Sequence, residues 1–242
     1  MRRGSDNPTD VQKRGFPMTI LKSFLVAGVA LAATATAANA TTVTYTSNVV
    51  PLTSTNFSGV ALNLQQFNPT WGVLTGISVH LHGDILGSAR AESLDAAPET
   101  VTLNLSATLT LTRPDNSTIV VTTPVVNKIA SLSAFDGMVD YGGTSGVAYL
   151  NQSAHADNTV ALSAGDFALF TGIGNVSGLL NGSGASAATG AGNLATLFLT
   201  QAGGFADVTY TYTPTTQTPE PAALALLGLG MGVLGFARRR AA

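Results

Sequence analysis

Two of the three histidines in this 242-residue chain, His80 and His82, lie two positions apart, and Asp84 follows at the same interval. Residues with this spacing point to one side of a β-strand. Two imidazoles and a carboxylate can bind a transition metal, but such an ion needs further ligands. His155 and Asp157 have suitable side chains, yet nothing in the sequence places them nearby. The pattern favours a solvated polar face, with a metal site as the alternative, and we expect no resident metal or cofactor.

A second set of candidate ligands consists of aspartates in segments that contain Gly and Asn. Carboxylate oxygens of this kind are the ligands that Ca²⁺ prefers. The sequence has no Asp-x-Asp-x-Asp-Gly loop, and a negative surface that keeps the protein in solution explains the same residues. The aspartates are Asp136, Asp140, Asp157 and Asp166.

The chain lacks the sequence signatures of several enzyme classes. It has no Cys, which excludes thiolate metal sites, Cys nucleophiles and disulfides. No Gly-x-Ser-x-Gly elbow occurs, and no pair of carboxylates is marked out for glycoside hydrolysis. The Gly-rich stretch 171–192 is not followed by a Lys and does not open a helix, so it is not a phosphate loop. We therefore expect a protein that is not an enzyme.

The middle of the chain has the alternation of β-strands. From residue 101 to 112 apolar and polar residues alternate without interruption, and the turn Arg113-Pro114-Asp115-Asn116 leads into a returning strand, 118–123. Residues 171–192 are expected to form a flexible loop, with one short strand at most. The pattern predicts an all-β fold, an antiparallel β-sandwich of jelly-roll or immunoglobulin-like type. The other expected strands are 42–50, 60–67, 74–82, 195–200 and 207–213.

Charge is distributed unevenly along the chain. Residues 41–218 contain ten acidic and three basic residues, which leaves a net charge of −7, whereas five Lys or Arg lie in the first 22 positions and three in the last five. A nucleic-acid-binding domain would be basic, so this class of partner is excluded. The basic residues instead flank two apolar segments.

The first apolar segment is 24–33, preceded by Lys22 and followed by Ala38-Asn39-Ala40. A cationic start, a short apolar core and an Ala-x-Ala end are typical of a secretory signal peptide. We expect signal peptidase to cut after Ala40, so that the mature chain begins at Thr41. We expect the signal-peptide region to span 1–40 and its apolar segment to be helical. Residues 1–17 are polar and do not fit the pattern, so Met18 is an alternative start of translation.

The second apolar segment, 222–237, is followed by Arg238, Arg239 and Arg240. Sixteen helical residues span about 24 Å, slightly less than the hydrocarbon core of a bilayer, and long Arg side chains can extend the reach. We expect a transmembrane helix in the inner membrane, with the Arg cluster in the cytoplasm and the acidic domain outside.

The segment Pro219-Glu220-Pro221 stands directly before this apolar run. Pro-Glu-Pro, an apolar span and an Arg cluster, in this order at the C-terminus, resemble the PEP-CTERM sorting signal of Gram-negative bacteria. The resemblance implies that an exosortase cuts near the Pro-Glu-Pro motif and sends the protein outward. The competing interpretation is a permanent C-terminal anchor.

The segment from Phe67-Asn68-Pro69 to Gly83 resembles the opening motif of the choice-of-anchor E domain. The segment from Val208 to Tyr212 is similar to the closing strand of that family, although Asn68 stands where an Asp is usual. The resemblance covers about residues 42–213. It implies an exported β-rich domain and supplies no catalytic residues.

Together these features divide the chain into a signal region, an exported domain 41–213, a linker 214–218 and a sorting signal 219–242. The expected function is that of an exosortase-processed protein of the cell surface or extracellular polysaccharide matrix, with a structural or adhesive domain. A carbohydrate- or calcium-binding module is the alternative, and an anchored glycan hydrolase is a more distant one. The expected partners are signal peptidase, exosortase, the inner membrane for a time, and extracellular polysaccharide.

Overall fold

The computed structural model describes residues 39–190, 192–215 and 227–231 of the chain. Two compact units are distinguished, 1–37 and 38–242, and the described residues all belong to the second. The expected signal helix therefore lies outside the described residues, as does the expected transmembrane helix apart from 227–231, which are helical. No helix among the described residues has both the length and the apolar character needed to cross a bilayer.

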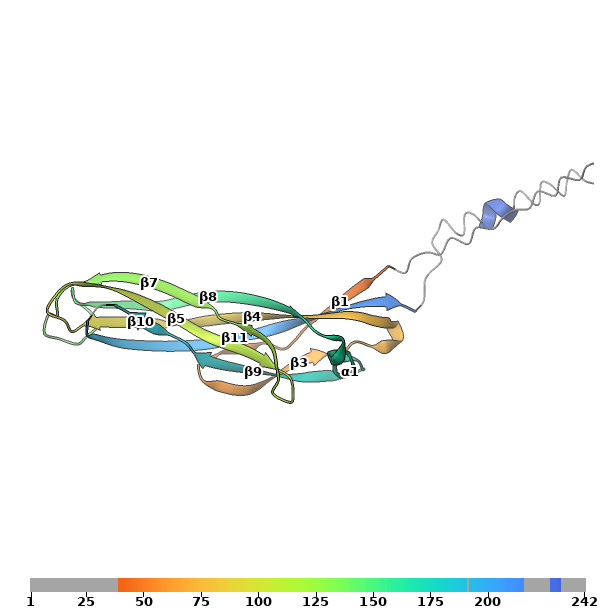
Figure 1. Ribbon diagram of the computed structural model, residues 1–242, viewed down its shortest axis with the longest axis horizontal. Coiled ribbons are helices and arrows are strands. Elements are labelled where there is room, and N and C mark those ends of the chain that lie inside the picture. The colour runs from red at the N-terminus through yellow and green to blue at the C-terminus, as the bar shows by residue number, and fades with distance from the viewer. Residues whose placement is uncertain (1–38, 191, 216–226, 232–242) are drawn as a thin grey trace, which may run out of the picture. The chain divides into compact units, whose positions relative to one another are not determined.

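The described part of the chain is mostly β, and its strands form two antiparallel sheets (Figure 1). In the first sheet β11 and β4 are central, β8 pairs with the free edge of β4, and β1 and β2 pair with β11. The prediction of an all-β antiparallel fold is confirmed. The strands of this sheet are β1 Thr41–Thr46, β2 Val50–Ser54, β4 Gly72–Ser93, β8 Gly146–Ala161 and β11 Leu194–Pro214.

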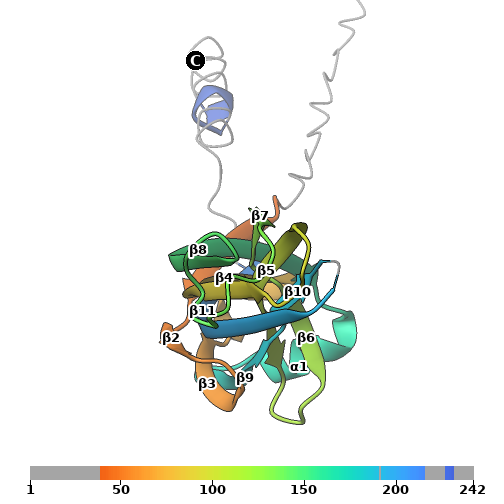
Figure 2. The same cartoon turned by 90° about the vertical axis from the view of Figure 1, so that its left-hand side faces the viewer.

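The second sheet is built around one long strand, β5. One edge of β5 pairs with β6 and β7, and β9 and β10 also pair with it, while β3 pairs with β9. In the view of Figure 2, β3 and β9 lie below β4 and β11. The strands of this sheet are β3 Phe57–Gln65, β5 Glu99–Thr112, β6 Thr118–Thr122, β7 Val125–Leu132, β9 Asn175–Gly184 and β10 Ala187–Thr189.

Three short helical turns connect the strands. The 3₁₀ helix η1 precedes β4, and Asn68 caps it because its Oδ1 accepts hydrogen bonds from the backbone N and the Oγ1 of Thr70. An Asn here therefore serves as well as an Asp, since either side chain offers the accepting oxygen. The helical turns are η1 Pro69–Trp71, η2 Ala164–Asp166 and α1 Phe167–Phe170.

The hydrophobic core is made by the alternate residues of β4 and β5. Leu103 and Leu109 of β5 are fully buried, as are Val79 and Leu81 of β4, and all belong to one apolar cluster. Alternate burial follows from the strand pleat, which sends successive side chains to opposite faces. The strand predicted over 101–112 is confirmed, and its apolar face is the buried one.

The longest pairing joins β4 and β11. Their register extends from Ser93↔Leu194 to Gly72↔Pro214, with one shift between Thr211 and Tyr212. This ladder covers nearly all of both strands. It therefore fixes which residues of β4 and β11 face the core and which face outward along the whole sheet.

The first and last strands of the domain pair with each other. In the antiparallel register of β1 and β11, Thr41 lies opposite Tyr212 and Thr46 lies opposite Asp207. β1 begins at Thr41 and β11 ends at Pro214. The two ends of the β domain therefore leave it side by side.

An aromatic cluster closes the core near these ends. Phe67 contacts Trp71, Tyr210 and Tyr212, with ring centroids 5.9, 5.7 and 5.1 Å apart. The hydroxyl of the buried Tyr210 donates to the carbonyl oxygen of Gln65 at 2.7 Å. Burial raises the pKa of Tyr210, so this hydroxyl stays a donor at any physiological pH.

The structure corrects several sequence-based boundaries. Residues 171–192, expected as a flexible loop, contain β9 and β10, and Leu180 of β9 is fully buried. The Gly and Ser residues there hid the strand because their composition resembles that of a linker. The expected strands 195–200 and 207–213 are parts of one strand, β11, and 42–50 is divided between β1 and β2.

We predict that Leu103→Ala destabilises the domain by about 2–5 kcal/mol, because it leaves a cavity in the core. The neighbouring Thr102→Ala, on the opposite face of β5 and half-buried, is expected to cost less than about 1 kcal/mol. Urea unfolding followed by tryptophan fluorescence measures both. Equal losses in the two variants would contradict the assigned faces of β5.

Candidate metal centre

All three histidines of the chain gather on the outer face of the first sheet. His80 and His82 come from β4, where Val79 and Leu81 point into the core, and His155 comes from β8. In the antiparallel register of these strands His82 lies opposite Asp157, and Asp84 lies opposite His155. Residues that face each other in this way have neighbouring side chains. The strand pairing thus brings together groups that are about 70 residues apart in the chain.

One carboxylate oxygen lies at the centre of this cluster. The Oδ1 atom of Asp157 is 2.6 Å from Nε2 of His155 and 3.1 Å from Nδ1 of His82. It is also 3.9 Å from Nε2 of His80. A single oxygen therefore faces a ring nitrogen of every histidine in the protein.

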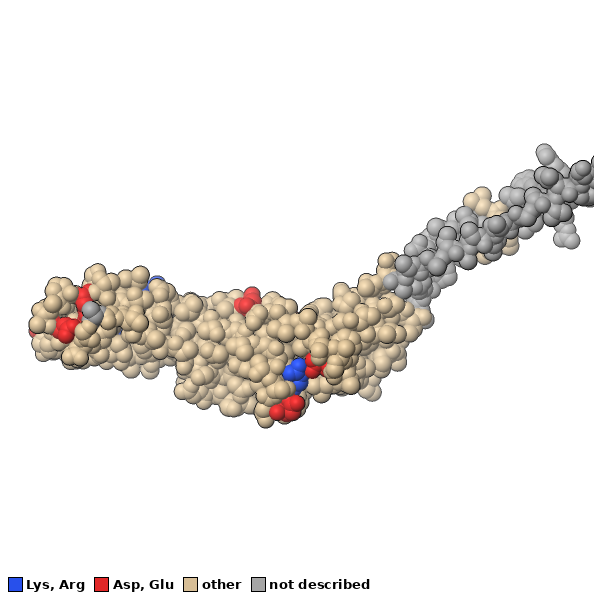
Figure 3. All heavy atoms as spheres, in the orientation of Figure 1, with Lys and Arg blue, Asp and Glu red and all other residues tan. Residues whose placement is uncertain are grey.

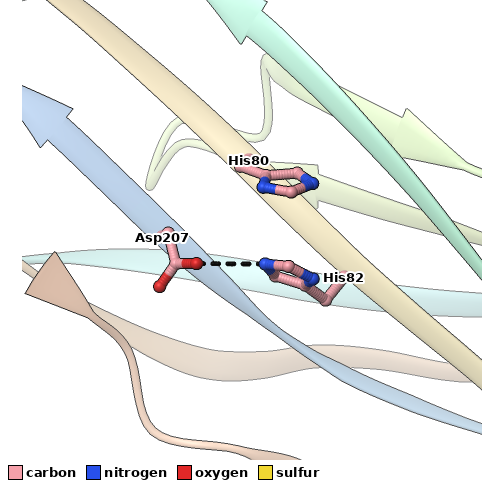
Figure 4. A group of neighbouring side chains, drawn as sticks. All are labelled: His80, His82 and Asp207. Carbon is pink, nitrogen blue, oxygen red and sulfur yellow. Dashed lines mark hydrogen bonds and ion pairs between the residues drawn. The ribbon is translucent and has the colours of Figure 1, made fainter. Parts of the chain in front are cut away.

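Two further carboxylates hold the opposite ring nitrogens. Asp84 Oδ1 is 2.8 Å from Nδ1 of His155, and Asp207 Oδ2, on β11, is 3.0 Å from Nε2 of His82. The latter contact is the dashed line in Figure 4. Thr46 on β1 donates its hydroxyl to Asp207 Oδ1 at 2.5 Å. His82 and His155 are thus each held between two carboxylates.

Packing fixes the ring of His82 in addition. The ring of Phe205, opposite His82 in the β4–β11 register, stacks on it with centroids 4.2 Å apart and planes 13° apart. The ring of His80, two residues earlier in β4, also lies close to it, with centroids 4.0 Å apart. The side chain of His82 is 17% exposed, compared with 48% for His155. His82 is therefore the least exposed of the three histidines.

The cluster concentrates negative charge. Among the described residues, the carboxylates of Asp84, Asp157 and Asp207 have histidines and a hydroxyl as partners, and no Lys or Arg pairs with them. The pKa of His155 is raised, chiefly by its hydrogen bond with Asp84, with the charges of Asp157 and Asp84 adding and partial burial opposing. The site attracts cations, whether a proton or a metal ion.

A shallow hollow of about 480 Å³ adjoins the cluster on this sheet. It crosses four strands where β11 contributes Gly203 and Gly204, and Asp84 and His155 form part of its lining. Exposed apolar side chains of Val49 and Leu52 border it on the β2 side. One side of the cluster is therefore open to solvent.

The aspartates considered for Ca²⁺ lie in separate places. Asp136 and Asp140 each accept a hydrogen bond from a backbone N–H two residues further on, within the connection between β7 and β8. Asp166 forms an ion pair with Arg113, with 2.8 Å between Oδ1 and the guanidinium Nη2. Within the described ranges, both groups of three or more possible metal ligands contain histidine. The expected set of four aspartates does not form one site.

A buried carboxylate that the sequence did not mark lies at the far end of β4. Glu92 is fully buried, and Ser145 donates its hydroxyl to Glu92 Oε1 at 2.5 Å. Ser145 belongs to the connection between β7 and β8, and its backbone carbonyl also accepts from Ser93. This contact attaches the connection to the sheet.

Few charged side chains lie on the face of the molecule drawn in Figure 3.

The structure brings together the weak metal candidates His80, His82 and Asp84, and adds His155 and Asp157, which the sequence could not place. Asp207 was missed as a member of this cluster. Its position in the alternation of β11 put it on the polar face, but the pairing of β11 with β4 has no local signal. Of the processing residues, Ala40 and Thr41 are described, whereas Ala38, Pro219, Glu220, Pro221, Arg238, Arg239 and Arg240 lie outside the described residues.

Comparison with known protein families identifies a sorting motif at the C-terminus. Residues 217–241 match the PEP-CTERM protein-sorting motif. A search of curated proteins finds no match. The chain thus carries a sorting motif whose presence implies an exported, cell-surface-sorted protein that exosortase processes.

Solved structures similar to this chain include particles of infectious bursal disease virus. The T13 viral particle has 14% sequence identity and a TM-score of 0.22, with 83% of this chain and 47% of that chain covered. The T=1 particles have 10% identity and a TM-score of 0.21, with 73% and 37% covered. The chain spans less than half the length of these proteins, and such low scores carry no argument about fold or function.

We predict that Asp84→Asn lowers the pKa of His155 toward the ordinary value of 6.5, because the amide removes the charge that stabilises the imidazolium. The interaction of the His155 imidazolium with these carboxylates stabilises the fold fully below pH 6.5. This contribution to the free energy of unfolding is lost as the pH rises through the pKa of folded His155. NMR titration of the histidine ring signals in metal-free protein measures both forms. Asp115→Asn, in an exposed turn, is the control, and an unaltered His155 titration in Asp84→Asn would contradict the assigned contact.

Proposed function

We propose that this chain is an exported protein of the cell surface or extracellular polysaccharide matrix, with a structural or adhesive β domain that is not an enzyme. The observation that carries the proposal is the match of residues 217–241 to the PEP-CTERM motif. The domain itself is proposed to be a β-sandwich of jelly-roll or immunoglobulin-like type, related to the choice-of-anchor E domain. Its bacterial host is proposed to be Gram-negative.

The proposed route has three steps. Signal peptidase removes residues 1–40, the apolar run 222–237 holds the protein in the inner membrane for a time, and exosortase cuts near Pro219-Glu220-Pro221. Proline disfavours helix at its own position and at the residue before it, which is the basis for proposing that a protease can reach this motif. The cytoplasmic Arg238–Arg240 cluster stays behind with the cleaved fragment.

The boundaries of the β domain support this route. Its first strand begins at Thr41, directly after the proposed signal-peptidase site, and its last strand ends at Pro214, before the proposed exosortase site. Both cuts would therefore spare every strand. Because β1 and β11 pair, the mature domain keeps its two ends fixed to each other.

The outward faces of the strands support a structural role. On β1 and β11 they carry short hydroxyl side chains, and Thr44 Oγ1 and Thr209 Oγ1 form a hydrogen bond of 2.8 Å across the strands. β-branched polar residues stabilise an exposed sheet without offering a reactive group. Such a surface suits contact with polysaccharide hydroxyls, which we propose as the partner outside the cell.

Replacing Pro219, Glu220 and Pro221 by Ala tests the sorting step. We expect this variant to accumulate in the membrane fraction with its Arg-rich terminus intact, because exosortase no longer cuts it. Mass spectrometry of the C-terminal peptide and fractionation of the producing bacterium measure the change. The wild-type protein should lack residues 238–242 when recovered from the surface or the medium.

The matched control replaces Pro214, Thr215 and Thr216 by Ala, which changes a proline and the same number of residues upstream of the motif. This variant should be processed normally. If the Pro-Glu-Pro variant is processed like the wild type, the proposed sorting step is wrong. If wild-type protein from the surface retains its C-terminal Arg residues, the chain is permanently anchored instead.

A further inference from the structure

We infer that His82, His155 and Asp157, whose ligand atoms all lie within 4.8 Å of one another, form a binding site for a divalent transition metal ion of the Zn²⁺ class. The ligand atoms are Nδ1 of His82, Nε2 of His155 and Oδ1 of Asp157, and the fourth position of a tetrahedral ion is open to solvent. Asp84 and Asp207 are positioning residues that hold two of the imidazoles. The site is independent of the proposed sorting route, since it lies wholly within the β domain.

The spacing of the ligand atoms supports the site. In a tetrahedral zinc site with metal–ligand distances of about 2.1 Å, neighbouring ligand atoms are about 3.4 Å apart. The distances from Asp157 Oδ1 to the ligand nitrogens of His155 and His82 are 2.6 and 3.1 Å, somewhat shorter than that value, and all three ligand atoms lie within 4.8 Å of one another. Small side-chain rotations of partly exposed residues are enough to admit an ion between them.

The hydrogen-bonding capacity of the rings points the same way. Both ring nitrogens of His82 and both of His155 face carboxylate oxygens, at distances between 2.6 and 3.1 Å. A neutral imidazole has one N–H donor, so one nitrogen of each ring would direct its lone pair at a carboxylate. A bound cation removes this repulsion, and a metal ion on the Asp157 side does so without a second proton on either ring, because the lone pairs and the carboxylate then all face it.

The outer carboxylates are arranged as in known zinc sites. An imidazole that binds a metal through one nitrogen commonly donates its other N–H to a carboxylate, which fixes the ring and increases its basicity. The carboxylate in this role is Asp84 for His155 and Asp207 for His82. Thr46 in turn donates to Asp207, so the arrangement extends to β1.

The chemistry of the donors selects the class of ion. Imidazole nitrogens favour Zn²⁺, Cu²⁺ or Ni²⁺, whereas Ca²⁺ and Mg²⁺ require mostly oxygen ligands. The three aspartates around the histidines would be balanced in part by the two charges of the ion. Because His155 and Asp157 are about half-exposed, the ion would be reached from solvent.

A second arrangement of the same residues competes for His82. His80, His82 and Asp207 also have ligand atoms close enough for one ion, as Figure 4 shows for these side chains. This arrangement would use Nε2 of His82 and would leave Asp157, whose Oδ1 faces a nitrogen of all three rings, outside the site. In the set centred on Asp157, the outer ring nitrogens of both histidines keep a carboxylate partner, Asp84 for His155 and Asp207 for His82. The two sets make different predictions for variants at Asp157 and Asp207.

Titrating the metal-free protein, purified without a histidine tag, with Zn²⁺ tests the inference. We expect saturable binding of one ion by calorimetry, and a rise in melting temperature of roughly 5–10 °C at a Zn²⁺ concentration of 100 Kd. Ca²⁺ at the same concentration should give no rise. Co²⁺ should bind with the intense visible absorption of a tetrahedral site.

Variants at exposed positions separate ligands from neighbours. Asp157→Asn and His155→Gln should lose Zn²⁺ binding, while Asp207→Asn should bind with a Kd increased ten- to a hundredfold. Thr159→Ala, on the same strand and face as Asp157, is the matched control and should bind like the wild type. The melting temperatures of the metal-free variants show that each is folded.

The inference is wrong if the wild type shows no saturable Zn²⁺ binding, or if Asp157→Asn and His155→Gln bind as tightly as Thr159→Ala. Loss of binding in Asp207→Asn with retention in Asp157→Asn would also overturn it, in favour of the competing ligand set. None of these results depends on the sorting motif. A failure here and a failure of the proposed export are therefore distinguishable.

Discussion

The antiparallel ladder between β4 and β11 is the constraint on which the rest of the structure depends. It extends over nearly the whole length of both strands and determines the face on which each residue lies. Its inward residues, such as Val79, Leu81 and Val208, are fully buried. The outward residues between them include His80, His82 and Asp207. The same pleat that builds the core therefore builds the cluster on the other face of the sheet.

Much of the architecture was predictable from local pattern. The alternation over 101–112 predicted the buried face of β5, and the strand expected from residue 42 begins within one residue of the observed start of β1. What local pattern could not supply was pairing. Asp157 and Asp207 are separated from His82 by 75 and 125 residues, and no feature of either segment specifies β4 as its neighbour. The Gly- and Ser-rich strand β9 was missed because small residues pack under the side chains of β3 and β5 without an apolar alternation of their own.

The C-terminal sorting motif and the histidine cluster depend on the sequence in different ways. The C-terminal motif acts through its sequence alone, as a short address that an exosortase recognises and that is absent from the mature protein in the proposed route. The histidine cluster acts through the fold, because it requires β4, β8 and β11 in register. A metal held by His82 and by His155 would join two neighbouring strands of the sheet outside the cell, where the protein has no disulfide to stabilise it.

Anomalous X-ray scattering from a zinc-soaked crystal, recorded on both sides of the zinc absorption edge, tests the account most directly. We expect one strong peak on the outer face of the first sheet, about 2.1 Å from His82 Nδ1, His155 Nε2 and Asp157 Oδ1. A crystal with no peak at this position, or with zinc bound between His80 and Asp207 while Asp157 stays free, would contradict it.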